Sequence, residues 1–201
     1  MSFKTDILQI IKDESRVFFD KQIEGRFLSD TLGRLVGKAD ALVFATSTEE
    51  VSALLKYADA NKISVTPRGA GTNLVGSTVP QNGGIIIDFS KMNKILEFDA
   101  DTFTATVESG ILLKDFQAFV ESKGFFYPPD PGEKSASIGG NIATNAGGMR
   151  AVKYGVTRDY VRGLEVVLAD GSVTWVGSKN VKDASGLSLK NLIIGSEGTL
   201  A

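Results

Sequence analysis

A glycine loop stands at residues 67–74, where the sequence is Pro67-Arg68-Gly69-Ala70-Gly71-Thr72-Asn73-Leu74. Gly69 and Gly71 adopt positive φ readily and carry no side chain, so successive amide N–H groups can line one concavity. Thr72 and Asn73 add short hydrogen-bonding side chains, and Arg68 adds a cation close by. The loop therefore predicts a diphosphate site.

The chain before this loop predicts a strand–helix–strand unit. Residues 41–44 and 63–66 are apolar enough for strands, and Ser47 with Glu50 forms a capping box that opens a helix between them. The glycine loop then lies at the carboxyl end of a strand, which is where ligands bind in open α/β sheets.

Two better-known phosphate loops do not fit these residues. The dinucleotide fingerprint fails because Leu74 stands where its third glycine belongs. The P-loop pattern fails because Ser77 stands where that pattern requires lysine. For this loop alone, a glycine turn without a ligand stays open as the alternative.

Two further segments combine glycine with short polar residues. The first is Ser137-Ile138-Gly139-Gly140-Asn141-Ile142-Ala143-Thr144-Asn145-Ala146-Gly147-Gly148. Such a mixture lets a flat ligand with polar edges lie against the backbone, although close packing of two elements is the alternative. The second is Gly195-Ser196-Glu197-Gly198-Thr199-Leu200, which would pass as a turn if it stood alone.

The remaining pattern predicts a mixed α+β fold of two lobes. We expect a smaller α/β lobe over about residues 1–80 and a larger lobe over about 81–201, with a mixed or antiparallel sheet flanked by helices. The elements expected are a first helix capped by Thr5 and continuing past Val17 and Phe18, strands at 84–89 and 102–108, a helix at 113–122, and a hairpin of 160–168 and 173–176 around a type I′ turn at Asp170-Gly171.

Composition excludes several classes of function. The 22 basic and 24 acidic residues give a net charge of −2, too acidic for a domain that neutralises nucleic-acid phosphates. There is no Cys and no His, so we expect no metal site and no catalytic residue here, and difficult chemistry must come from a cofactor. No stretch reaches the roughly 20 apolar residues of a membrane span. We expect a cytoplasmic protein.

Taken together, the three glycine segments resemble the FAD-binding domain of the vanillyl-alcohol oxidase / p-cresol methylhydroxylase (PCMH-type) superfamily, from about Ala41 to the last residue. The nearest likeness is to the FAD-linked subunit of glycolate oxidase and to D-lactate and D-2-hydroxyglutarate dehydrogenases. Some members tether FAD through His or Cys. Because this chain has neither, the resemblance implies noncovalent FAD.

The resemblance also implies which residues hold FAD. In that family the first loop encloses the pyrophosphate, the second segment and the turn before it line the flavin and its ribityl phosphate, and the third lies near the adenosine half. The positions carried over are Pro67, Arg68, Gly69, Ala70, Gly71, Thr72, Asn73, Leu74, Pro129, Asp130, Pro131, Ser137, Ile138, Gly139, Gly140, Asn141, Thr144, Asn145, Gly147, Gly148, Tyr154, Glu197 and Gly198.

The function implied by the resemblance is oxidation of a small 2-hydroxy acid, of the glycolate or D-lactate type, by hydride transfer to FAD. Members continue after the third segment into a substrate-cap domain, so we expect a chain truncated before that domain, with little turnover of its own. The expected partners are the hydroxy acid and an electron-acceptor subunit or quinone. The alternatives are a reductase of the enolpyruvyl-UDP-sugar type and a stand-alone nucleotide-binding or interaction module.

Overall fold

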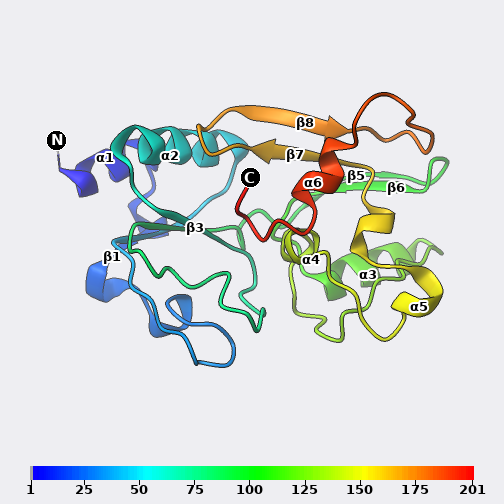
Figure 1. Cartoon of the computed structure of the whole chain (residues 1–201), viewed down its shortest axis with the longest axis horizontal. Helices are drawn as coiled ribbons and strands as arrows, with labels where there is room; N and C mark the ends of the chain where they lie inside the picture. Colours follow the sequence, from blue (N-terminus) through cyan, green and yellow to red (C-terminus); the bar gives the residue numbers. More distant parts are fainter. Residues whose placement is uncertain (1) are drawn as a thin grey trace.

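The computed structural model describes residues 2–201. Two groups of elements lie side by side, and a long hairpin runs along both of them (Figure 1). The first group holds α1 (Phe3–Ile10), β1 (Val17–Phe19), β2 (Ala41–Phe44), α2 (Thr48–Asn61), β3 (Val65–Arg68) and β4 (Ile85–Asp88). The second holds β5 (Ile95–Asp99), β6 (Thr104–Val107), α3 (Leu113–Ser122), α4 (Ile138–Thr144), α5 (Ala151–Tyr154) and α6 (Leu189–Ile193).

The first group is built on a four-stranded sheet in the order β1-β2-β4-β3. β2 and β3 both run parallel to β4, and β1 pairs antiparallel with β2. The central strands are almost wholly apolar, as expected of parallel strands covered on both faces. Ile7 and Leu54, from α1 and α2, pack with Val43 and Ile87 on one side of this sheet.

β3 begins two residues later than the sequence predicts, at Val65, and therefore includes Pro67 and Arg68. A proline fits there because β3 is an edge strand, and an edge strand can lack one ladder donor. Arg68 is paired in register with Asp88 of β4. The glycine loop thus starts where two neighbouring parallel strands end.

The prediction for the first helix is wrong in extent and cap. Ser2 is the N-cap, and α1 ends at Ile10. Val17 and Phe18 lie in β1, because β2 offers a strand edge with which this aromatic and β-branched run can pair. Ser47 caps α2 as predicted, but the Glu50 carboxylate accepts from the Thr46 amide and from Arg16 instead of closing the box.

The first sheet also extends past residue 80, because β4 is hydrogen-bonded between β2 and β3. The division into lobes at about residue 80 stays a prediction. In the second group, α3 has the predicted bounds, and its Leu113, Phe116 and Val120 form a separate core cluster with Ile138 of α4.

The hairpin of β7 (Gly163–Val167) and β8 (Val173–Gly177) connects the two groups. Near its turn, the Ser52 hydroxyl of α2 donates to the Gly171 carbonyl at 2.6 Å, and just past β8 Lys179 pairs with Glu97 of β5. The predicted type I′ turn is wrong, because Gly171 has a positive φ and Asp170 does not. The Gly171 amide donates to the Leu168 carbonyl, which gives a longer loop with one left-handed residue.

Candidate functional site

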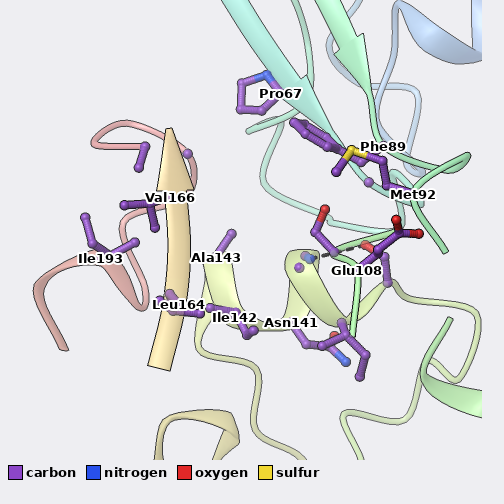
Figure 2. A pocket seen from close by; sticks show the side chains of 18 of the residues that line it. Pro67, Phe89, Met92, Glu108, Asn141, Ile142, Ala143, Leu164, Val166 and Ile193 are labelled. Carbon is purple, nitrogen blue, oxygen red and sulfur yellow. Dashed lines mark hydrogen bonds between the residues drawn. The ribbon is translucent and has the colours of Figure 1, made fainter. Parts of the chain in front are cut away.

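A cleft of about 2010 Å³ lies between the two groups. Figure 2 shows Pro67 and Phe89, at the ends of β3 and β4, on one side of it. Asn141 and Ala143 of α4 lie across from them, and Leu164 of β7 forms a further wall. The carboxyl ends of the parallel strands therefore open onto the cleft, as ligand sites in such sheets do.

Residues 69–74, which we call the amide loop, line this cleft throughout. Among residues 2–201, no acceptor is found for the backbone N–H groups of Gly69, Gly71, Thr72, Asn73 and Leu74. The Ala70 amide makes only a long contact of 3.4 Å with the Ser137 hydroxyl. Because backbone donors are normally paired in folded proteins, five free ones in one loop mark a place for an acceptor-rich ligand.

Arg68 differs from the sequence prediction of a cation beside the ligand. Its side chain is buried, and Nη2 donates to the Arg26 carbonyl at 2.8 Å while Nη1 donates to the Thr78 hydroxyl at 3.1 Å. The guanidinium lies over the Phe27 ring. Burial lowers the pKa of Arg68 from its ordinary value, and the carboxylate of Asp88 opposes that shift. The guanidinium is turned into the protein, beneath the amide loop.

Thr78 is a residue of this site that the sequence analysis missed. Its hydroxyl accepts from Arg68 and also from Asn73 Nδ2, at 2.8 Å, and it lines the cleft. Asn73 is thus engaged within the protein by its side chain, while its backbone amide has no acceptor in the described part of the chain. No local signal marks Thr78, since it is one polar residue in a turn-rich segment.

The second glycine segment forms α4 and uses its amides differently. The N–H groups of Ile138 and Gly139 donate to the carbonyls of Ile111 and Ser109, at 2.8 and 2.7 Å. The Gly140 amide donates to the Ser137 hydroxyl, which caps the helix. A Cβ at Gly139 would lie 2.7 Å from Ser109 Cβ, so this glycine serves close packing.

Asn141 is the exception in α4. Asn141 as a whole residue is 4% exposed and lines the cleft (Figure 2). Within the described chain, its Nδ2 has no hydrogen-bond partner. A buried donor without an acceptor is costly, so it indicates a ligand group at this point.

The third segment docks on the carboxyl end of α4. The amides of Gly195 and Glu197 donate to the carbonyls of Ile142 and Ala143, at 3.1 and 2.8 Å. Gly198 has a φ of +74° and lies against Pro67, so that a Cβ would be 2.6 Å from the proline ring. In the same way, a Cβ at Gly69 would collide with the Ser137 hydroxyl. The structure thus brings the three segments together.

Some of the remaining predicted residues line the cleft and others do not. Pro131, Ile138 and Thr144 line it. Those outside its lining are Pro129, Asp130, Asn145, Gly147, Gly148 and Tyr154.

Several of these six have visible structural roles. The Asp130 carboxylate accepts from the Gly132 amide and faces Arg150 at 3.6 Å. Asn145 ends α4 in the left-handed region and accepts from the Arg158 amide. Gly148 lies directly against the Asp130 carbonyl. As FAD ligands they stay predictions.

The side-chain charges of the cleft do not favour an anion by themselves. The cations that line it are Lys62, Arg68, Arg162 and Lys179, and the carboxylates are Glu49, Asp59, Glu108, Glu133, Asp159, Glu165 and Glu197. An anionic ligand in this cleft would need neutral donors, such as the unpaired loop amides. The described residues contain no group of three His, Cys, Asp or Glu side chains placed to hold a metal ion. They also contain no helix with the length and apolar character of a membrane span.

Comparison with curated proteins gives close relatives. The chain is 54% identical over 187 residues to a D-lactate dehydrogenase of Anaerostipes hadrus, covering 92% of this chain and 39% of that protein. It is 45% identical over 200 residues to the glycolate oxidase subunit GlcD of Bacillus subtilis, covering 98% of this chain and 42% of that protein. The chain therefore spans about two fifths of the length of these relatives.

Solved structures share the fold at lower identity. An alkyldihydroxyacetonephosphate synthase superposes with a TM-score of 0.81 at 23% identity, covering 99% of this chain and 37% of that one. The 6-hydroxy-D-nicotine oxidase of Arthrobacter nicotinovorans superposes with a TM-score of 0.69 at 22% identity, covering 80% of this chain and 35% of that one. Residues 39–177 match the family described as FAD binding domain, which is most of the chain. The chain belongs to this family of FAD-binding domains, and its cofactor is FAD.

Proposed function

We propose that the diphosphate of FAD binds, without a covalent bond, to the free N–H groups of the amide loop. These five unpaired amides are the observation that carries the proposal, because phosphate oxygens are strong acceptors. Gly71 supports it, since its φ of +70° gives the loop a left-handed turn that a residue with a side chain rarely adopts. The absence of His and Cys from the sequence supports noncovalent binding.

α4 is proposed to hold the ribityl and flavin part. Its backbone approaches the cleft closely at Gly140, and the unpaired Nδ2 of Asn141 can donate to a polar edge of the ligand. Apolar side chains such as Leu164, Val166 and Ile142 exclude water from the neighbouring wall (Figure 2). These residues bind and orient the cofactor, which is the part of the catalysis that a cofactor-binding domain supplies.

The whole protein is proposed to oxidise a small 2-hydroxy acid of the D-lactate or glycolate type. When bound, FAD supplies a two-electron acceptor for the hydride of the substrate carbon. The names of the relatives support this substrate class over the sugar reductase and the inactive module. Substrate binding and proton abstraction are assigned to a cap domain beyond the part of the relatives that this chain matches.

The electrons are proposed to leave to a partner subunit or a quinone, in the cytoplasm. The word subunit in the name of the Bacillus subtilis relative supports a partner of that kind. The domain itself needs neither partner to bind FAD, because the three glycine segments that meet at the cleft all come from one chain.

Flavin retention tests the cofactor site. The purified chain is mixed with FAD, desalted and scanned, and a resolved flavin absorption band with stoichiometry near one is expected. Loss of all flavin from a folded chain would contradict the proposal. In the whole protein, D-lactate or glycolate should bleach the flavin under anaerobic conditions. Bleaching by NADPH instead would favour the reductase.

A further inference from the structure

We propose that Arg68 is a positioning residue that holds the amide loop open from beneath and does not itself contact the diphosphate. This inference rests on the proposed function, because it concerns how the same loop binds FAD. Arg68 then supports the loop from inside the protein instead of binding phosphate as a cation. Thr78 is the partner on which this support depends.

The contacts of the guanidinium carry the first step. Nη2 donates to the Arg26 carbonyl at 2.8 Å, and Nη1 lies 3.4 Å from the Ser29 carbonyl and 3.1 Å from the Thr78 hydroxyl. Arg68 is 7% exposed, and its guanidinium lies over the Phe27 ring. One planar fork therefore joins β3 to residues 26–29 and to Thr78, which a single ammonium cannot do with the same geometry.

The second step is the contact between this fork and the loop. A Cβ at Gly71 would collide with the Arg68 guanidinium, so the loop backbone lies directly on it. Thr78 accepts from both Arg68 and Asn73, which ties the far end of the loop to the same point. On the outer side, the Thr31 hydroxyl donates to the Gly71 carbonyl at 3.1 Å. Because the Gly71 carbonyl is held there, its neighbouring amides stay free for the cleft.

The third step concerns charge. With Arg68 turned inward and carboxylates outnumbering the other cations of the cleft, the diphosphate is held by neutral amide dipoles. Interactions between exposed charges weaken strongly with salt, whereas hydrogen bonds from fixed dipoles do so much less. We therefore expect FAD affinity to change less than about threefold between 0.05 and 0.5 M NaCl.

The experiment compares Arg68→Lys, Arg68→Met and Thr78→Val for binding of FAD and of riboflavin, which lacks phosphate. All three variants are expected to lower the affinity for FAD at least about tenfold, the loss that follows from removing one charge-assisted hydrogen bond. Riboflavin affinity should change much less. Arg68→Met combined with Thr78→Val should be no weaker than Arg68→Met alone, and the weak salt dependence should be the same in every variant. Thr78→Ser, which keeps the hydroxyl, should restore binding.

Arg16→Lys is the matched control. Arg16 is another largely buried arginine whose guanidinium donates to a carbonyl, that of Phe44, and pairs with Glu50. This control should lose stability without changing the ratio of FAD to riboflavin affinity. Equal loss in the control and in the Arg68 variants would overturn the proposal, because it would indicate general destabilisation.

Two other results would also overturn it. The first is a set of three outcomes: Thr78→Val leaves FAD affinity unchanged, Arg68→Lys preserves it, and Arg68→Met removes a salt dependence that the unaltered chain shows. Together these outcomes would indicate that Arg68 contacts the diphosphate directly. The second concerns the case in which the unaltered chain binds no FAD. That outcome would contradict the proposed function, but it would not by itself test the role of Arg68. Hydrogen exchange in the ligand-free chain then decides. Arg68→Lys should speed exchange of the Val79 and Lys38 amides, which donate to Gly76 and Pro80, and unchanged exchange would contradict the support role.

Discussion

The amide loop and α4 are both rich in glycine, yet their backbone amides differ: in the described chain, those of the loop are mostly unpaired and those at the start of α4 are paired. In the amide loop, which lines the cleft, five N–H groups have no acceptor among residues 2–201. At the start of α4, the amides of Ile138, Gly139 and Gly140 are all engaged by protein oxygens. Glycine in the loop allows the left-handed backbone at Gly71 and close contact with Arg68 and Ser137, so the loop can keep the path that leaves its amides unpaired. Glycine in α4 lets the helix approach the segment around Ser109.

This difference separates two kinds of effect that a substitution can have. A side chain added to the amide loop should impair the cofactor site and leave the fold largely intact. A side chain added at the start of α4 should act on packing first and on FAD only through it. Four predictions test this comparison, beginning with the largest effect.

Gly71→Asp should abolish FAD retention while the circular dichroism spectrum stays that of a folded protein. The new Cβ would meet the Arg68 guanidinium, the backbone φ of +70° disfavours any side chain, and the displaced guanidinium would no longer support the loop. We expect at least about a hundredfold loss of affinity, or about 3 kcal/mol. Gly124→Asp is the control, because Gly124 has a φ of +82° with open space around it. Equal retention in both variants would contradict the role of the loop.

Gly139→Ala should lower the free energy of unfolding by about 2 kcal/mol, a cost typical of an overpacked contact. Its Cβ would lie 2.8 Å from the Ser109 carbonyl oxygen, and that backbone cannot move without disturbing the bond from the Gly139 amide. Gly140→Ala should cost less, since a Cβ there would meet only the Ser137 hydroxyl. Urea denaturation measures both. A larger loss at Gly140 would reverse our assignment of the packing contact.

Asn141→Leu should lower the affinity for FAD about tenfold. The free energy of unfolding of the ligand-free domain should stay within about 1 kcal/mol of the original value. Its Nδ2 has no partner among residues 2–201, so an apolar side chain of similar size removes a desolvated donor without breaking a bond. Fluorescence titration and urea denaturation measure the two quantities. Clear destabilisation of the ligand-free variant would show that Asn141 has a structural partner.

Alkaline pH should act on the α4 side of the cleft before it acts on the amide loop, which has no titrating side chain between residues 69 and 74. Burial raises the pKa of Tyr127, which packs against Phe116 in the cluster that includes Ile138, to about 12. Its folded pKa lies above the unfolded value, so its favourable contribution is present below about pH 10 and lost between about 10 and 12.

The size of this effect is about 1 kcal/mol, because the tyrosine is partly accessible to solvent. Tyr127→Phe should remove that part of the alkaline loss of stability, measured from urea midpoints between about pH 9 and 11.5. Identical pH profiles for the two proteins would show that Tyr127 ionises without a folding penalty.

Much of the fold follows from local pattern. The bounds of α3, the capped start of α2 and the β7–β8 hairpin were predictable because their periodicity and turn residues lie within a few positions of one another. β1 was not, because it depends on pairing with β2, more than twenty residues away. The site, too, was predictable only in part. The sequence predicts which glycine segments meet at the cleft.

The state of each amide and the direction of Arg68 could not be predicted. The acceptors that engage α4 are Ser109 and Ile111, about thirty residues upstream, and the carbonyl that holds Arg68 belongs to Arg26, about forty residues upstream. Residue type alone cannot reveal whether a distant carbonyl faces a given N–H group. The same limit explains why Thr78 carries no signal in the sequence.

The most direct test of the central claim is an amide-resolved NMR titration of the chain labelled with ¹⁵N. Addition of FAD should shift the resonances of Gly71, Thr72, Asn73 and Leu74 in the direction of stronger hydrogen bonding, while riboflavin should leave them close to their starting positions. The amides of Ile138 and Gly139 should shift little, since protein carbonyls already engage them. Saturation with FAD that leaves the loop amides unmoved would contradict the account.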